Sequence, residues 1–239
     1  MLWIDRTFAT PEQNLACDEA LLDLCGKNGG PEVLRFWEPS QHFVVLGYAN
    51  KASREVNLDV CRQRDIPIQR RCSGGGTVLQ GPGCLNYSLV LRIRDESPWA
   101  TVAGANRTIL ETHQQAMAPI LKEPVVIEGH TDLAIGGLKF SGNAQRRRLQ
   151  AILFHGTFLL RFDLSLMEEW LAFPSNQPTY RRGRAHEDFV MNLNLPPDLV
   201  KQALRKAWNA REILEPVPDE LIEQLVRDKY SQAAWTFRF

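Results

Sequence analysis

The order of apolar and polar residues first predicts a helix near the start of the chain. Thr10-Pro11-Glu12-Gln13 places threonine at the cap, proline at the first helical position and glutamine three residues after the cap, which is a typical helix start. Apolar residues then recur at helical spacing from Leu15 to Leu24. We therefore expect a helix from about Pro11 to Cys25.

Further along, strand-like and helical segments follow each other without strict alternation. Short runs of branched and aromatic residues predict strands at Val33–Trp37, His42–Leu46, Leu85–Leu91, Asp132–Ile135, Leu138–Ala144, Ala151–Phe162 and Ala234–Phe239. Helical periodicity predicts helices at Leu58–Arg64, Thr101–Leu121, Leu164–Leu171, Asp198–Trp208 and Asp219–Tyr230. This irregular order favours an α+β fold, with antiparallel sheet after residue 130, over a doubly wound sheet.

Composition narrows the class of protein. The chain has 239 residues, 44% hydrophobic and 23% charged, with a formal net charge of +0, so we expect one globular domain over residues 1–239 and no nucleic-acid or membrane partner. The N-terminus lacks a signal-peptide pattern and no run reaches the ~18 apolar residues of a membrane span, so we expect a cytoplasmic protein. The five cysteines show neither paired spacing nor nearby histidines, which supports neither disulfides nor a zinc site.

The segment from Gln69 to Leu91 carries the strongest chemical signal. Three consecutive glycines, Gly74 to Gly76, let the backbone approach a ligand closely. Arg70 and Arg71 precede them and supply forked donors suited to a carboxylate or phosphate. The spacing fits neither a Walker loop nor a dinucleotide fingerprint. The segment therefore predicts an anion-binding loop of another kind.

A second polar segment runs from His130 to Leu160. Lys139 follows a Gly136-Gly137 turn and is either an exposed hairpin lysine or a charge that stabilises acyl or adenylyl transfer. Asp132 could hold a metal or orient that lysine. His155 lies in an otherwise apolar strand and is either a core histidine or a base.

Three motifs in chain order carry a family resemblance. They are Arg70-Arg71-x-Ser73-Gly74-Gly75-Gly76-Thr77-Val78 with Leu85-Asn86-x-Ser88, then Asp132-Leu133 with Gly137-x-Lys139-x-Ser141-Gly142-x-Ala144, and then His155-Gly156-Thr157-x-Leu159-Leu160. With weaker matches between about residues 11 and 195, they make the chain similar to the lipoate protein ligase and octanoyltransferase family, which shares its catalytic fold with biotin protein ligases. The resemblance implies mixed, mostly antiparallel sheets flanked by helices.

The resemblance also implies a site and its ligands. Lys139 is the implied catalytic residue, Asp132 the implied metal ligand, and the substrate-binding residues are Arg70, Ser73, Gly74, Gly75, Gly76, Thr77, Val78, Asn86, Gly142, Ala144, His155, Gly156 and Thr157. Trp37, Val45, Val78, Leu79 and the Leu85 strand are expected to line an apolar tunnel. The implied substrates and cofactors are lipoate or octanoate, ATP and Mg²⁺, and the implied partner is an acceptor lipoyl domain.

Departures from the family pattern shape the hypotheses. Gln80 stands where the family often has histidine, and no cysteine occurs where octanoyltransferases carry their nucleophile. We therefore expect an ATP-dependent ligase or lipoyltransferase that acylates a lysine through an acyl adenylate. We expect it to lack a C-terminal accessory domain and to use, if needed, a separate accessory protein. The alternatives are octanoyl transfer from a carrier protein, with Cys72 or Cys84 as nucleophile, and a non-catalytic lipoate-binding homologue.

Overall fold

The computed structural model describes residues 1–27, 29–148 and 150–239 and has a large sheet at its centre. Along this sheet the strand order is β11-β1-β2-β6-β10-β9-β8-β7. The strands are β1 (Leu2–Asp5), β2 (Val33–Trp37), β6 (Cys84–Arg92), β7 (Val126–Glu128), β8 (Asp132–Ile135), β9 (Leu138–Arg148), β10 (Ala151–Leu159) and β11 (Glu212–Ile213). Strand β1 runs parallel to β2 and β11, and the other neighbours are antiparallel. The expected α+β class with a mixed, mostly antiparallel sheet is confirmed.

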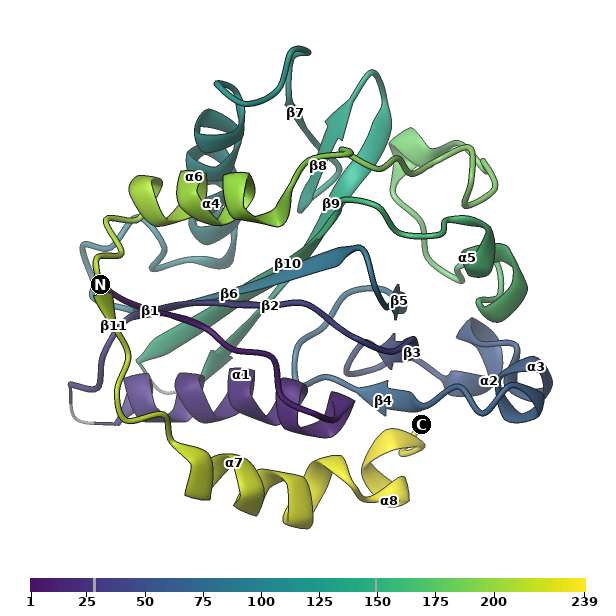
Figure 1. Cartoon of the computed structure of the whole chain (residues 1–239), viewed down its shortest axis with the longest axis horizontal. Helices are drawn as coiled ribbons and strands as arrows, with labels where there is room; N and C mark the ends of the chain where they lie inside the picture. The colour runs from purple at the N-terminus through teal and green to yellow at the C-terminus, as the bar shows by residue number, and fades with distance from the viewer. Residues whose placement is uncertain (28, 149) are drawn as a thin grey trace.

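A second, smaller sheet forms the right-hand part of the molecule in Figure 1. Its strand order is β4-β3-β5, with β3 at Phe43–Leu46, β4 at Ile68–Arg70 and β5 at Val78–Gln80. The short helices α2 (Ala52–Glu55), α3 (Leu58–Gln63) and α5 (Ser165–Trp170) contribute to the apolar core on this side. Because β4 ends and β5 begins on either side of the glycine segment, this sheet anchors both ends of that loop.

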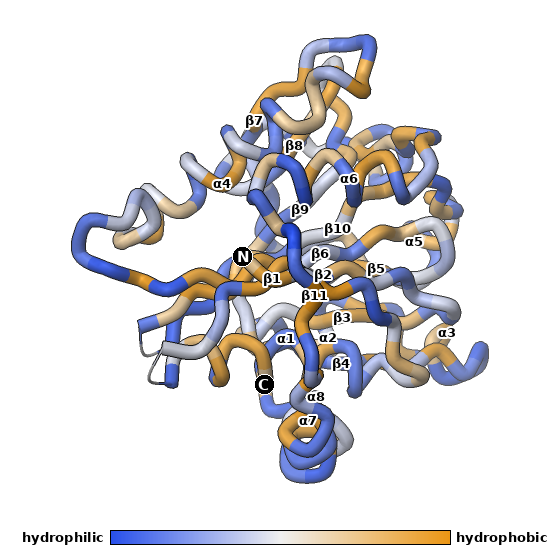
Figure 2. The backbone as a smooth tube through the Cα atoms, turned by 60° about the vertical axis from the view of Figure 1, so that its left-hand side comes forward, coloured by the Kyte–Doolittle hydropathy of each residue, from blue (hydrophilic) through white to orange (hydrophobic). Residues whose placement is uncertain are grey.

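Helices cover both faces of the large sheet. Helices α1 (Pro11–Gly26) and α7 (Asp219–Leu225) lie on one face, and α4 (Val102–Met117) and α6 (Pro197–Ala207) on the other (Figure 1). In β10, Leu153 packs with α1 while Ile152 and Phe154 pack in the α4–α6 core, because successive side chains of a strand point to opposite faces. Strands that are buried on both faces have continuous runs of apolar residues. Figure 2 shows such runs as orange, hydrophobic stretches of the backbone tube at the centre of the molecule.

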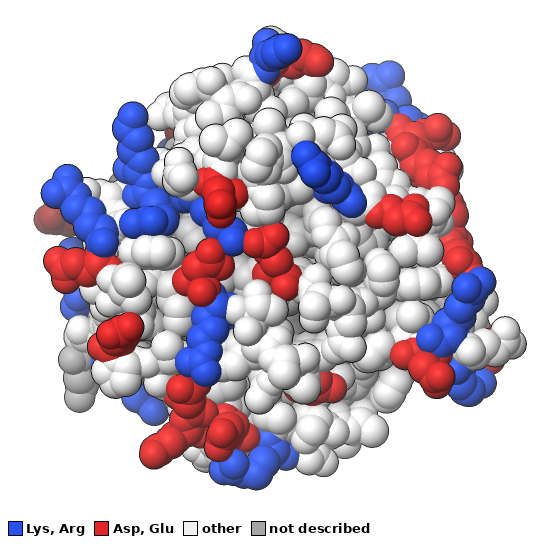
Figure 3. Space-filling view, in the orientation of Figure 1, with Lys and Arg blue, Asp and Glu red and all other residues white. Residues whose placement is uncertain are grey.

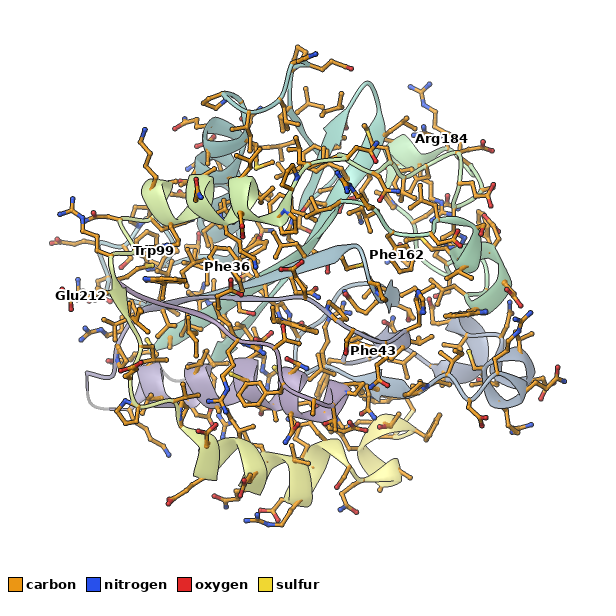
Figure 4. The ribbon with its side chains drawn as sticks, viewed as in Figure 1. Phe36, Phe43, Trp99, Phe162, Arg184 and Glu212 are labelled. Carbon is orange, nitrogen blue, oxygen red and sulfur yellow. The ribbon has the colours of Figure 1, made fainter. Side chains whose placement is uncertain are left out.

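The core on each side of the sheet includes large aromatic side chains among its aliphatic ones. Phe36 belongs to the α4–α6 core and Phe43 to the α1 core, and Figure 4 places their labels on the corresponding sides. The face of the molecule shown in Figure 3 carries positive and negative side chains intermixed. Within the three described ranges, none of the helices has the length and apolarity that a membrane crossing requires.

The predicted start of the first helix is confirmed in atomic detail. The Thr10 side chain accepts from the Gln13 backbone N–H, and the Gln13 side chain accepts from the Thr10 N–H. This reciprocal pair satisfies two backbone donors that would otherwise be free at the helix end. Helix α1 therefore begins at Pro11, and its first turns place Leu15 and Asp18 beside the large sheet.

The prediction for the end of the chain is wrong. Residues expected as a strand at Ala234–Phe239 instead form helix α8 (Ala233–Thr236), which follows a π-helical turn, η2 (Val226–Tyr230). The carbonyls of Trp235 and Thr236 accept hydrogen bonds from Arg70, and the Trp235 indole donates back to the Arg70 carbonyl. A tertiary contact thus overrides the aromatic, strand-like composition of this segment.

Candidate functional site

A cavity of about 680 Å³ lies between the two sheets and the segment that follows α5. One group of lining side chains is apolar and consists of Leu15, Trp37, Val45 and Val78. A second group is polar and includes Asp132, Lys139, Asn143, Tyr180 and Arg181, where Thr179–Arg181 forms the short helix η1. The cavity thus combines an apolar wall with a cluster of charged and hydrogen-bonding groups.

Most of the residues expected at the site lie together in this cavity. Those that line it are Gly75, Gly76, Thr77, Val78, Asn86, Asp132, Lys139, Gly142, Ala144, His155, Gly156 and Thr157. Gly74 lies directly next to this lining in the chain, Ser73 is fully buried outside it, and Arg70 points elsewhere. Of the residues expected in the apolar tunnel, Trp37, Val45 and Val78 line the cavity, whereas Leu79 packs into a separate core. The Leu85 strand contributes Asn86 and Tyr87 to the lining, and Leu85 itself packs into the core.

The glycine loop is held in shape by Arg71. The buried Arg71 guanidinium donates to the Gly74 carbonyl at 2.5 Å and to the Gly76 carbonyl at 2.7 Å. Gly75 has φ +86, a conformation that favours glycine. Gly47 must also lack a side chain, because a Cβ there would stand 2.1 Å from the Gly75 carbonyl oxygen. The loop is therefore a defined wall of the cavity whose exposed backbone faces open space.

Arg70, expected to bind substrate, has a different task in the structure. It is fully buried, and its guanidinium donates to the carbonyls of Gly47, Tyr48, Asn50, Trp235 and Thr236. These contacts occupy all three nitrogens and join the loop after β3 to helix α8. All three guanidinium nitrogens of Arg70 are therefore already used by backbone carbonyls.

Lys139 takes part in a compact polar cluster. Its Nζ lies 2.8 Å from Asp132 Oδ1, and the Tyr180 hydroxyl donates to Asp132 Oδ2 at 2.8 Å. Burial and the neighbouring Asp132 charge raise the pKa of Tyr180, so this hydroxyl stays protonated as a donor. A Cβ on Gly142 would stand 2.6 Å from Lys139 Nζ. Glycine at that position therefore leaves room for the ammonium group.

A chain of hydrogen bonds runs from the glycine loop into the large sheet. Ser73 Oγ lies 2.6 Å from His155 Nε2, and His155 Nδ1 lies 2.9 Å from Asp18 Oδ2. Arg35 pairs with the other Asp18 oxygen at 2.6 Å. Burial alone raises the pKa of Asp18, but the Arg35 charge and the His155 hydrogen bond outweigh it and hold that pKa below its usual value.

Gln80 belongs to a closed ring of three polar side chains. Gln80 Nε2 donates to Thr157 Oγ1 at 2.7 Å, Thr157 Oγ1 donates to Asn86 Oδ1 at 2.5 Å, and Asn86 Nδ2 donates to Gln80 Oε1 at 2.9 Å. All three residues line the cavity, from β5, β6 and β10. At position 80, where the resemblance leads one to expect a titratable histidine, this chain has a glutamine in an uncharged hydrogen-bonded ring.

The cysteines are poorly placed for covalent catalysis. All five are described, all are buried, and none lines the cavity. Burial raises the pKa of the Cys72 and Cys84 thiols to about 12, so the thiolate that attacks acyl groups is scarce at neutral pH. The alternative that uses Cys72 or Cys84 as nucleophile therefore has no support in this geometry.

The expected metal ligand, Asp132, is also occupied. Its two oxygens pair with Lys139 and Tyr180, and among the residues with described positions no three His, Cys, Asp or Glu side chains gather as a metal site would need. This set does not fit a protein-bound cation, which normally takes several oxygen ligands.

Two charged residues of the site have no counterpart in the sequence predictions. Asp18 lies on α1, about one turn after Leu15, and Arg35 lies inside the apolar strand β2. Both are almost completely buried. A charged residue at a position that periodicity assigns to the core is unusual. This pattern is the sequence signal from which Asp18 and Arg35 could have been identified as site residues. The cavity-lining segment from Pro174 to Arg181 has no regular period. Its one sequence signal is Arg181, a basic residue that could supply positive charge to the site.

Comparison with known proteins places this cavity in context. Residues 10–209 match the family profile described as the lipoyl protein ligase A/B catalytic domain. The chain is 28% identical over 267 residues to octanoyltransferase LipM of Carboxydothermus hydrogenoformans, covering 99% of this chain and 98% of the relative. It is 33% identical over 164 residues to a putative lipoate-protein ligase A of Aeropyrum pernix, covering 68% of this chain and 58% of that protein.

Solved structures with the same architecture include ligand complexes. A putative lipoate protein ligase from T. acidophilum with bound lipoic acid superposes with a TM-score of 0.81 and 25% identity, covering 100% of this chain and 98% of that one. A lipoate-protein ligase A bound with ATP gives a TM-score of 0.78 and 26% identity, covering 99% and 97%. The relatives thus include both octanoyltransferases and lipoate ligases.

Proposed function

The chain belongs to the lipoyl protein ligase A/B catalytic domain family, and on that premise we propose that it transfers an octanoyl or lipoyl group to a lysine of a lipoyl domain. The observation that carries the proposal is the cavity itself, which joins an apolar wall to the Lys139–Asp132–Tyr180 cluster. An acyl chain gains ~0.8 kcal/mol for each methylene removed from water. Such a wall suits an aliphatic chain, and the Lys139 ammonium within the cluster suits its carbonyl end.

Lys139 has the central role in the proposed chemistry. Attack on an acyl carbonyl places negative charge on its oxygen, and a fixed ammonium nearby stabilises that charge. Asp132 orients Lys139 through its contact at 2.8 Å, and the Tyr180 hydroxyl in turn holds Asp132 at 2.8 Å. The exposed backbone of Gly75 and Gly76 provides a second wall against the same part of the ligand.

The first candidate donor is an octanoyl thioester of an acyl carrier protein. The support is the alignment with an octanoyltransferase over nearly the full length of both chains. Because the cavity is lined by no cysteine and the buried thiols have raised pKa values, we propose direct transfer from the thioester to the lysine. The C–S bond breaks, the C–N bond forms, and the carrier leaves as a thiol.

The second candidate is ATP-dependent ligation of free lipoate or octanoate. Its support is the similarity to structures that hold lipoic acid or ATP, together with Arg181. This side chain is 4% exposed and lines the cavity, and its Nη2 has no hydrogen-bond partner among the described residues. A buried guanidinium with a free donor suits a phosphate oxygen.

One experiment decides between the donors. The protein is incubated with an apo lipoyl domain and one of two donor mixtures. The first contains octanoyl carrier protein, and the second contains octanoate or lipoate together with ATP and magnesium. The mass of the lipoyl domain is then measured by mass spectrometry. A mass gain of one acyl group with the carrier protein alone supports thioester transfer, and a gain that requires ATP supports ligation. No gain with any donor contradicts the proposed function and favours a lipoate-binding homologue.

A further inference from the structure

A group of aromatic and arginine side chains lies on the surface beside the glycine loop. The Tyr48 ring packs against Trp235 and Phe239, at 5.9 and 6.0 Å between ring centroids. The guanidinium of Arg238 lies 4.9 Å from the centre of the Tyr48 ring, and that of Arg146 lies 5.4 Å from it. Phe239 is 46% exposed, and both arginines are exposed. We call these five residues the Tyr48 patch.

The two arginines of the Tyr48 patch are not neutralised by neighbouring acids. Arg148, two positions after Arg146 on β9, pairs with Glu19 and Asp23. Among the residues with described positions, Arg146 and Arg238 contact no carboxylate and stack on aromatic rings instead. A guanidinium that stacks on a ring is held in place and is weakly hydrated. The patch therefore presents two preorganised positive charges to a negatively charged ligand.

Strand β9 connects the Tyr48 patch to the cavity. Gly142, Ala144 and Arg146 lie on the same face of β9, because alternate residues of a strand point to the same side. The first two line the cavity, and a Cβ on Gly142 would meet the Lys139 ammonium. Arg146 lies four residues after Gly142, which places it roughly 13 Å further along the strand. The patch thus lies just outside the part of the cavity that holds Lys139.

The glycine loop connects the same patch to the cavity on a second side. The Tyr48 N–H donates to the Ser73 carbonyl at 2.8 Å, which fixes the start of the loop after β3 against the glycine loop. Gly75 and Gly76 are exposed and also line the cavity, so they form part of its rim. A molecule that covers this part of the rim therefore also covers Tyr48.

We propose that the Tyr48 patch is the docking surface for the acceptor lipoyl domain, which rests on the proposed acyl transfer. Arginine and aromatic residues are enriched where proteins bind each other, and the two arginine charges require carboxylates opposite them. The acceptor is the one protein that takes part with either candidate donor. The domain that fits this surface carries carboxylates roughly 13 Å from its target lysine, as the strand spacing between Gly142 and Arg146 indicates.

Charge reversal tests the docking surface. Arg146→Glu and Arg238→Glu should each raise KM for the apo lipoyl domain about 5-fold, and the double variant at least 10-fold, with kcat within about two-fold, since charges at an interface rim act mainly on association. KM for the acyl donor should stay unchanged. Arg107→Glu is the matched control, because Arg107 is exposed on α4 and lies outside the cavity lining. This variant should behave like the wild type.

Salt and an aromatic truncation supply the second arm of the test. In the wild type, kcat/KM for the lipoyl domain should fall several-fold as NaCl is raised from about 20 to about 200 mM, because salt screens charges between exposed groups. The double variant should lose this dependence. Phe239→Ala should raise the same KM about 3-fold, as expected for loss of an aromatic contact at an interface. Thermal melts check that each variant is folded.

Two results would overturn the docking surface. The first is an unchanged KM for the lipoyl domain in the folded double variant. The second is a rise in KM that is confined to octanoyl carrier protein, which would assign the Tyr48 patch to the donor. In both cases the wild-type protein still acylates the lipoyl domain. Failure of the wild-type reaction with every donor would instead remove the proposed function itself.

Discussion

Lys139 and Gly142 act as a pair, because the glycine leaves the space that the lysine ammonium fills. Lys139→Ala removes the only ammonium group among the residues that line the described cavity. We expect at least a 100-fold loss of acyl transfer, with a melting temperature close to that of the wild type, since the side chain is 26% exposed. The measurement is the initial rate of lipoyl-domain acylation. An active variant would contradict the role given to this lysine.

Gly142→Ala tests the same point while keeping the lysine. The new methyl group would stand 2.6 Å from both Cε and Nζ of Lys139, so the flexible lysine end must move and its contact with Asp132 is disturbed. We expect the transfer rate to fall about 10-fold, with the fold retained. Gly136→Ala, at a turn with φ +57, serves as the contrasting variant, since it strains the backbone but meets no lysine atom within 4 Å.

The two cysteines that flank the glycine loop should be dispensable for chemistry. Cys72 and Cys84 are buried and have thiol pKa values raised to about 12. Changing each to Ala should leave the transfer rate within about two-fold while lowering stability by roughly 1 kcal/mol, as expected for a small buried cavity. Loss of transfer in a folded Cys84→Ala protein, together with a thioester adduct in the wild type, would restore the covalent alternative.

At the level of elements, Arg70 joins three segments that are distant in the chain. Its guanidinium binds carbonyls of the loop after β3 and of α8. Arg70→Met would bury these carbonyls without donors, so we expect the free energy of unfolding to fall by about 2–4 kcal/mol. Urea unfolding measures this, and exposed Arg146→Met is the control. A fully stable Arg70→Met protein that no longer binds the acyl donor would instead support a role of Arg70 in substrate binding.

The elements themselves were predictable where local physics dominates. The capping box before α1 and the glycine turn between β8 and β9 were both read correctly, because their signals lie within a few residues. Strand β1, strand β4 and helix α2 are each five residues or shorter and leave no periodic pattern. A helix, α8, forms where a strand was predicted, because Arg70 holds the backbone carbonyls of Trp235 and Thr236. These residues lie 165 and 166 positions after Arg70 in the chain.

Across the whole molecule, a buried histidine should make stability depend on pH. His113 on α4 is fully buried, accepts a hydrogen bond from Trp208, and has its pKa lowered by burial from 6.5 to about 3. Between these values the unfolded chain binds a proton that the folded chain does not. The free energy of unfolding therefore falls as the pH is lowered from about 6.5 towards 3, by up to about 1.4 kcal/mol per pH unit.

Substitution isolates this contribution. His113→Gln keeps an acceptor for the Trp208 indole but cannot take up a proton. Urea unfolding between about pH 4 and pH 7 should show a flatter pH dependence in the variant than in the wild type. An unchanged slope would mean that other groups, and not His113, control acid sensitivity.

The sequence alone determined the α+β class and the family resemblance, and it pointed to the glycine loop, Lys139 and His155 as candidate site residues. These depend on residue spacing within single segments, and local backbone preferences and side-chain periods record such spacing directly. Only the tertiary structure showed that the neighbours Arg70 and Arg71 have different roles. Arg70 connects the loop after β3 to helix α8, and Arg71 holds the glycine loop in shape. It alone joined Ser73 to His155 and His155 to Asp18, partners 82 and 137 positions apart. Contacts between distant segments are set by packing of the whole chain, and no single segment carries their signal.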